Sequence, residues 1–291
     1  MVSAGEQTGL SGIESAAEVE ADRAAREDDP TPRDLVGHVL VWGVGPLMGE
    51  DACDREGLDE PPGAPGRRLT FNAKPWRWVD EQRPLRVLDV CAGWGSWSSE
   101  MRRLAFLMGW PVHITGVEID ERKRPHLEKW CDVALFGDWL ASIAGHEFDL
   151  VIGNPHFSAL THEYPAQSMP AVLLRYAPAV LLFHQMASFT RSIAGRDTWR
   201  AYPPAWIGMV PGSVGFRGRS RGADLRSYQA TLWLRGHEGP AETVLLPEPP
   251  MRAKKGKLSR SSSWHWDVPP GTEEPSAEMP AVPGWSGVRP G

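Results

Sequence analysis

The feature that most constrains the fold is an alternation of short apolar runs with helical patterns through the centre of the chain. Runs rich in β-branched residues, typical of strands, occupy Leu85–Val90, Val112–Val117, Val133–Phe136, Phe148–Ile152 and Ala179–Phe183. Segments with helical spacing separate or follow them, at Ser96–Met108, Glu121–Trp130 and Gln185–Ile193. Strands joined through helices indicate βαβ crossovers. The centre is therefore predicted to form an α/β fold with a mainly parallel, doubly wound sheet covered on both faces.

The segments outside this centre have a different character. Ile207–Val214 and Tyr228–Arg235 are strand-like and bracket an Arg/Gly-rich loop, which predicts a terminal antiparallel hairpin. The beginning of the chain is rich in Ala, Glu and Asp, and its end is rich in Pro, Ser, Glu and Gly. We therefore expect a disordered tail over 1–33, one domain over 34–237 and a disordered tail over 238–291.

Charge and cysteine content exclude several classes of protein. A formal net charge of -6 argues against a protein that coats polyanions, although local clusters of Lys and Arg can still bind them. Three cysteines, Cys53, Cys91 and Cys131, lack the spacing of metal ligands, so neither a disulfide framework nor a metal site is expected. The first residues resemble no secretory leader, and no apolar window is long enough for a membrane span. We expect a cytoplasmic protein without membrane association.

A glycine-rich turn after the first apolar run indicates a ligand site. The sequence reads Leu88-Asp-Val-Cys-Ala-Gly-Trp-Gly95, and glycines there let the backbone approach a ligand closely. A dinucleotide site normally has a third glycine, and the acidic Asp89 would repel a pyrophosphate but suits a cationic ligand that carries an ammonium group. The pattern favours S-adenosylmethionine over NAD, with Asp89, Ala92, Gly93 and Gly95 as candidate cofactor-binding residues. An ordinary tight turn is the alternative interpretation.

Two more acidic positions follow the next two apolar runs. Glu118 and Ile119 end the second run, where a carboxylate can accept both ribose hydroxyls of a nucleoside. Asp120 is better explained as a charge at the start of the following helix, and this explanation is also the alternative for Glu118. Asp138 and Trp139 follow the third run, where Asp138 can accept a hydrogen bond from an adenine amino group and Trp139 can form a wall of its pocket.

The fourth apolar run leads directly into Asn154-Pro155-His156-Phe157. With the Gly-x-Gly turn, Gly116-Val-Glu-Ile-Asp120 and Gly137-Asp-Trp-Leu140, this tetrapeptide resembles the amino-group methyltransferases, whose fourth motif is Asp/Asn-Pro-Pro-Tyr/Phe. The likeness extends over about residues 70–236 and is greatest to the phage and prophage type of N6-adenine DNA methyltransferases. It implies a Rossmann-like class I methyltransferase sheet and S-adenosylmethionine as cofactor.

The resemblance also implies roles for the tetrapeptide. In the family, the Asn side-chain oxygen and the following Pro carbonyl accept the two N–H bonds of the target amine and aim its lone pair at the methyl group. Such fixed acceptors provide electrostatic preorganisation without a strong base or a metal. Asn154 and Pro155 correspond to these acceptors, and Phe157 corresponds to the aromatic residue that stacks on an extruded base. His156 departs from the family's second proline and loosens the turn.

Substrate contacts are expected from an arginine cluster before the last strand-like segment. Arg217, Arg219 and Arg221 lie on a Gly-rich loop, where they suit phosphate contacts, and a solvated loop is the alternative. The predicted partner is DNA with the target adenine flipped out of the helix. The family often has a cofactor-contacting Thr-Pro segment upstream, and Thr70–Trp76, which lies at that place, lacks the pair. Alternative functions are methylation of rRNA or of a protein glutamine, or a catalytically silent module that binds cofactor or nucleic acid.

Overall fold

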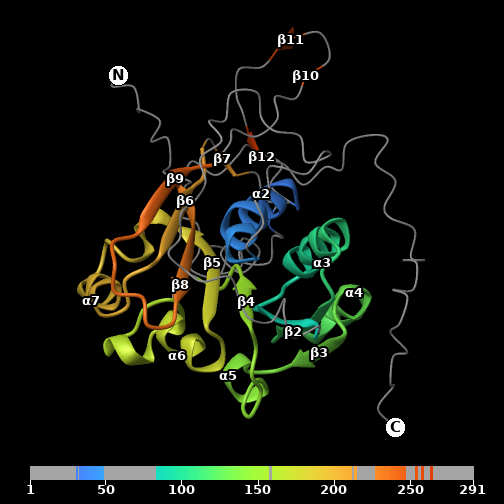
Figure 1. Ribbon diagram of the computed structural model, residues 1–291, viewed down its shortest axis with the longest axis horizontal. Coiled ribbons are helices and arrows are strands. Elements are labelled where there is room, and N and C mark those ends of the chain that lie inside the picture. Colours follow the sequence, from blue (N-terminus) through green and yellow to red (C-terminus); the bar gives the residue numbers. More distant parts are fainter. Residues whose placement is uncertain are drawn as a thin grey trace, which may run out of the picture.

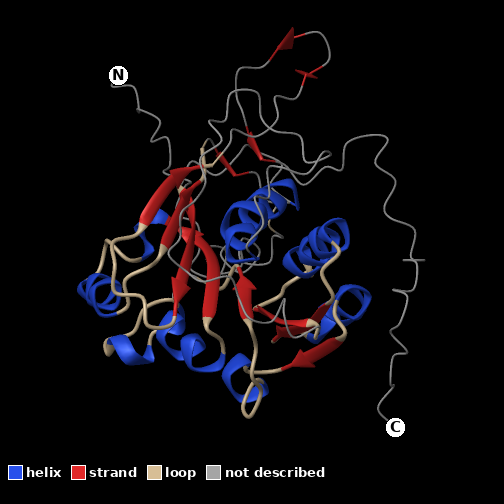
Figure 2. Cartoon of the chain, in the orientation of Figure 1, coloured by secondary structure: helices blue, strands red, loops and turns tan. Residues whose placement is uncertain are grey.

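The computed structural model describes most of the central part of the chain and short pieces of the remainder. The described residues are 31, 33–48, 83–156, 159–211, 213–214 and 227–246, with the two-residue strands at 253–254, 257–258 and 263–264. Figure 1 shows the longer of these segments gathered around one large sheet, and Figure 2 shows the helices that border it.

The large sheet contains eight strands in the order β3-β2-β1-β4-β5-β8-β6-β9. Its strands are β1 (Leu85–Val90), β2 (Val112–Glu118), β3 (Val133–Phe136), β4 (Leu150–Gly153), β5 (Ala179–Gln185), β6 (Trp206–Met209), β8 (Tyr228–Leu234) and β9 (Glu242–Leu245). Strands β1 to β5 pair in parallel, and β8 runs antiparallel to both of its neighbours, β5 and β6. The structure thereby confirms the doubly wound α/β sheet with a terminal antiparallel hairpin.

Helices and small sheets complete the described fold. The helices are α2 (Arg33–Val44), α3 (Ser96–Met108), α4 (Arg124–Trp130), α5 (Trp139–Ser142), α6 (Met169–Tyr176) and α7 (Ile193–Ala201), with 3-10 turns η1 (Gly45–Met48), η3 (Glu121–Lys123), η5 (Pro165–Gln167) and η6 (Met186–Ser188). Strand β7 (Ser213–Val214) pairs with β12 (Ser263–Trp264), and β10 (Ala253–Lys254) pairs with β11 (Lys257–Leu258). Among the described helices, none is long and apolar enough to cross a membrane.

The sheet separates two apolar clusters because side chains alternate along each strand. In β1, Leu85 and Val87 belong to the cluster under α2 and α3, whereas Leu88 and Val90 belong to the cluster with α6. Helices α2 and α3 lie side by side over the first cluster (Figure 1). Burial on both faces explains why the central strands read as nearly continuous apolar runs, and it gives the strand ends a rigid support.

The structure also corrects some boundaries. The prediction of a helix over Gln185–Ile193 is wrong, because β5 continues to Gln185 opposite Tyr228 and α7 begins only after Ser192, whose hydroxyl accepts from the Gly195 N–H at 2.9 Å. Sequence analysis also missed the short helices α5 and α6. The described fold also includes residues outside 34–237, since Thr31 is buried and β9 pairs with β6 after residue 237.

Candidate active site

The candidate site lies where the order of strands reverses. The chain moves outward from β1 to β2 and β3 and then returns to place β4 on the other side of β1. In doubly wound sheets, ligands bind outside the carboxyl ends of the strands at such a reversal. Strand β1 leads there into the Gly-x-Gly turn, and the neighbouring β4 leads into Asn154. The fold therefore places the two principal motifs of the sequence next to each other.

The Gly-x-Gly turn has a left-handed backbone that opens space above it. Cys91, Gly93 and Gly95 have positive φ angles of 56°, 56° and 75°. The Ala92 N–H donates to the Val117 carbonyl at 2.9 Å, which fixes the turn to the end of β2. A Cβ atom added to Gly93 would meet nothing within 4 Å, so the described residues leave room for a ligand there.

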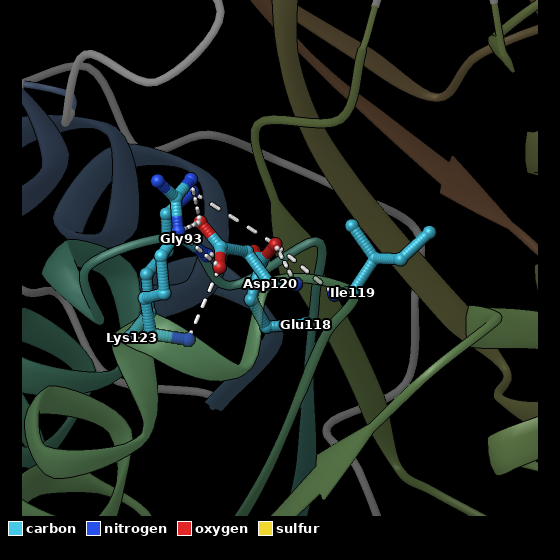
Figure 3. Close-up of polar contacts among 6 residues, drawn as sticks. Gly93, Glu118, Ile119, Asp120 and Lys123 are labelled. Atoms are coloured by element: carbon cyan, nitrogen blue, oxygen red, sulfur yellow. Dashed lines mark hydrogen bonds and ion pairs between the residues drawn. The ribbon is translucent and has the colours of Figure 1, made fainter.

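Glu118 holds this turn from the end of β2, as Figure 3 shows. Its Oε2 accepts from the Gly93 N–H at 2.7 Å, and its Oε1 accepts from the N–H groups of Ile119 and Asp120, both at 3.0 Å. Lys123 Nζ lies 3.8 Å from Oε1. A carboxylate offers about four acceptor positions, so the three backbone bonds leave one open, on Oε2. Glu118 is therefore suited to accept from one ribose hydroxyl, whereas the sequence suggested that it could accept from both.

The residues after Glu118 have different environments. Asp120 caps η3 by accepting from the Arg122 N–H at 3.1 Å and pairs with the Arg122 guanidinium at 2.6 Å. The hydrogen bond from the Arg122 side chain lowers the pKa of Asp120 to about 2. This geometry agrees with the capping interpretation of Asp120. Ile119 is 77% exposed and offers an apolar surface beside the buried Glu118 (Figure 3).

Asp89 lies beneath the turn and not on its open side. Its Oδ2 accepts from both the N–H and the hydroxyl of Ser98 in α3, at 2.9 and 2.6 Å, and the residue is fully buried. Its Oδ1 has no hydrogen-bond partner among the described residues. Burial raises the pKa of Asp89 to about 7 against the lowering effect of the Ser98 hydrogen bonds. Asp89 thus joins the turn to α3, and sequence analysis missed its partner Ser98.

The raised pKa of Asp89 predicts a specific pH dependence of stability. In the unfolded chain an aspartate ionises near pH 3.9, so between that pH and about 7 the folded protein binds one more proton than the unfolded chain. The contribution of Asp89 to stability is therefore complete below pH 4 and falls as the pH rises to 7, by up to about 1.4 kcal/mol per pH unit.

Comparison of Asp89→Asn with the wild type isolates this effect. His184, fully buried with a pKa lowered to about 4, has the opposite dependence and is present in both proteins. We expect urea unfolding at several pH values to show the wild type losing stability relative to Asp89→Asn between pH 4 and 7. A constant difference between the two proteins over that range would contradict the assignment.

The third strand end carries Asp138 and Trp139 as expected. Asp138 is exposed and caps α5, because its Oδ1 accepts from the Ala141 N–H at 2.9 Å. Trp139, the first residue of α5, is half-buried against the apolar cluster that contains Leu88 and Val90. Both residues follow β3, and two strands, β2 and β1, lie between β3 and the strand β4 that leads into Asn154.

At the end of β4, Asn154 presents an unpaired acceptor. Its Nδ2 donates to Thr31 Oγ1 at 3.0 Å, while its Oδ1 is buried without a partner among the described residues. Pro155 is buried and His156 is exposed. The His156 backbone N–H forms a hydrogen bond with the Cys91 thiol, whose pKa burial raises to about 12, so the Gly-x-Gly turn and the tetrapeptide are in contact. Phe157, Arg217, Arg219 and Arg221 lie outside the described residues.

Gly153 sets the path of the chain into Asn154. A Cβ atom at Gly153 would collide with the backbone carbonyl oxygen of Val90 at the end of β1. We therefore expect Gly153→Ala to lower the free energy of unfolding by about 1–3 kcal/mol, as overpacking typically does. Gly239→Ala is the control, because a Cβ there meets only the His237 side chain, at 3.2 Å. Urea denaturation of both variants tests this, and equal stabilities would show that the strand ends are not in close contact.

Thr31 is the site residue that sequence analysis missed. It lies in the segment expected to be a disordered tail, yet only 3% of it is exposed and it contacts Asn154. A signal was present, because Thr31-Pro32 is a Thr-Pro pair directly before the apolar segment that forms α2. The resemblance to the family predicts such a pair around residue 70, nearer to β1 in the sequence.

Among the comparisons with known proteins, only the one with solved structures finds matches. No protein-family model and no curated protein matches the chain. Within the described residues, no group of three His, Cys, Asp or Glu side chains is placed to hold a metal ion.

Several solved structures are similar to this chain, and they include class I S-adenosylmethionine-dependent methyltransferases. A putative enzyme of this class from Listeria monocytogenes is 15% identical, with a TM-score of 0.42, over 57% of this chain and 59% of its own. A putative RNA methyltransferase from Pyrococcus horikoshii is 14% identical, with a TM-score of 0.39, over 54% and 76%. The M protein of the type I restriction enzyme EcoKI is 11% identical, with a TM-score of 0.38, over 52% and 40%. All three TM-scores lie below 0.5, and the fold of this chain rests on its own strand order and pairing.

Proposed function

We propose that the chain is an S-adenosylmethionine-dependent N-methyltransferase that acts on an exocyclic amino group, with adenine N6 in DNA as the substrate. One observation carries this proposal: at the carboxyl end of β4, Asn154 has its Nδ2 engaged and its Oδ1 buried without a partner among the described residues. Buried acceptors normally have a partner, so an unpaired oxygen at a ligand-binding edge of the sheet suggests that a substrate N–H supplies it.

The residues around the turn fit the proposed cofactor. The open space at Gly93 suits a ligand that lies against the backbone, and the remaining acceptor position of Glu118 suits one ribose hydroxyl. The exposed Ile119 suits contact with a flat adenine ring, and Asp138 lies at the next strand end, where an adenine amino group would be recognised. Asp89 fits less directly, because Ser98 occupies its Oδ2. When bound, S-adenosylmethionine supplies an electrophilic methyl group.

The tetrapeptide accounts for activation of the amine. An exocyclic amine is a weak nucleophile because its lone pair is delocalised into the ring. Asn154 Oδ1 accepts a hydrogen bond from one N–H group of the amine. The resemblance to the family assigns the other N–H group to the Pro155 carbonyl. Two fixed acceptors favour a pyramidal nitrogen whose lone pair is free, and their fixed positions avoid reorganisation during the reaction. Neither the proposal nor the residues require a metal.

DNA adenine is favoured over other amines by the resemblance of the motifs to the N6-adenine enzymes. The aromatic Phe157 suits stacking on a flipped base, and Arg217, Arg219 and Arg221 suit phosphate contacts that add affinity without reading the sequence. The same tetrapeptide chemistry also suits a guanine amine in rRNA or a glutamine amide in a protein. The substrate therefore has to be identified by product analysis.

A labelled-methyl assay separates these possibilities. The purified chain is incubated with S-adenosylmethionine labelled in its methyl group and, in parallel, with unmethylated duplex DNA, rRNA or a protein extract. The proposal predicts label in DNA that is recovered as N6-methyladenine after hydrolysis. Label in rRNA or protein would reassign the substrate and keep the amine chemistry. Cofactor binding without transfer to any of the three would instead indicate a silent binding module.

A further inference from the structure

Thr31 reaches the catalytic tetrapeptide from a distant part of the chain. It precedes Asn154 by 123 residues, and its Oγ1 lies 3.0 Å from Asn154 Nδ2. Thr31 is buried next to the start of α2, a helix that packs against α3 and also contacts β6 and β8. The contact between Thr31 and Asn154 is therefore held by the packing of α2 on the fold.

The orientation of the Asn154 amide decides what it offers to a substrate. A carboxamide has an acceptor oxygen at one end and an NH₂ donor at the other, and rotation by half a turn exchanges them. An amine to be methylated needs an acceptor for its N–H and a free lone pair. If Nδ2 faced the amine, it would donate to that lone pair and compete with the methyl group. Only the orientation with Oδ1 toward the substrate is productive.

We propose that Thr31 is a positioning residue that holds the Asn154 amide in this orientation by accepting from Nδ2. The inference rests on the proposed function, because it assigns the freed Oδ1 to the target amine. In the reversed orientation, the Thr31 hydroxyl would donate to Oδ1 and the NH₂ group would face the site without an acceptor. The observed arrangement leaves Asn154 Oδ1 without a partner among the described residues, and a substrate N–H can satisfy it.

A structural test does not depend on catalysis. The side-chain NH₂ resonances of Asn154 are assigned in the full chain by their loss in Asn154→Asp, and their protection from exchange with solvent is measured in the absence of substrate. We expect Thr31→Val to lose this protection and Thr31→Ser to keep it. Thr198→Val is the matched control, since Thr198 is also fully buried but its hydroxyl has no partner among the described residues. Unchanged protection in Thr31→Val would overturn the proposed contact.

A kinetic test then addresses the positioning role. We expect Thr31→Val to lower kcat about five- to tenfold, the effect of one lost hydrogen bond. Its Kd for S-adenosylmethionine is expected to change by less than about twofold, and Thr31→Ser is expected to restore kcat. If Thr31→Val raised the Kd for S-adenosylmethionine and left kcat constant, Thr31 would belong to the cofactor site and the inference would be overturned. Full activity of Thr31→Val would overturn it as well. If the wild type transfers no methyl group although its Asn154 resonances are protected, the proposed function fails while the contact between Thr31 and Asn154 stands.

Discussion

Replacement of Asn154 by alanine is expected to lower kcat for methyl transfer by about 100- to 1000-fold, as removal of one preorganised polar group does in other active sites. The buried Oδ1 of Asn154 is the acceptor assigned to the target amine, and alanine provides none. Since Asn154 is assigned to the substrate, the Kd for S-adenosylmethionine should change by less than about twofold. Single-turnover kinetics with labelled cofactor measure the first quantity, and calorimetry measures the second.

The conservative variant Asn154→Asp is the control for this prediction. A carboxylate keeps an acceptor toward the amine, and the Thr31 hydroxyl can donate to its other oxygen. We therefore expect Asn154→Asp to keep more activity than Asn154→Ala. Transfer by Asn154→Ala at the wild-type rate would remove Asn154 from the chemistry.

Replacement of Glu118 by alanine is expected to raise the Kd for S-adenosylmethionine by about ten- to hundredfold, the effect of hydrogen bonds to a charged group. Two consequences combine in this variant. The ribose loses its acceptor, and the N–H groups of Gly93, Ile119 and Asp120 lose the carboxylate that holds the turn in shape. Calorimetric titration of the cofactor measures the effect.

Glu121→Ala provides a matched control from the same segment. Its side chain is 72% exposed and pairs with Arg124 at 3.0 Å, away from the turn. The Kd of this variant should change by less than about twofold. If Glu118→Ala bound the cofactor as tightly as Glu121→Ala does, the cofactor would lie elsewhere on the molecule.

The sequence was sufficient to predict every strand of the large sheet except β9, because those strands are marked by apolar runs, whereas β9 lies in the segment expected to be a disordered tail. The helix Ser96–Met108 was predicted with its observed boundaries, since Gly95 and Gly109 flank it with left-handed backbone. The region after β5 was mispredicted because polar residues continue the strand. His184 belongs to β5 and is fully buried, and its Nε2 lies 2.9 Å from the Thr231 hydroxyl on β8.

The candidate site was predictable only as far as local patterns reach. The acid at the end of β2 and the tetrapeptide after β4 follow from their places in the chain. The partner of Asp89 is Ser98 across the turn, and the partner of Asn154 is Thr31 at a separation of 123 residues. Such contacts depend on how α3 and α2 pack on the sheet. The Thr31-Pro32 pair marks Thr31 in the sequence, but no periodicity or motif indicates that its partner is Asn154.

The proposed function requires a methyl donor to bind at the reversal of strand order, against the turn that Glu118 holds. Calorimetric titration of the purified full chain with S-adenosylmethionine, and with NAD in parallel, measures this binding. We expect saturable binding of one S-adenosylmethionine per chain and no binding of NAD. A folded chain that binds NAD, or that shows no affinity for S-adenosylmethionine, would contradict it.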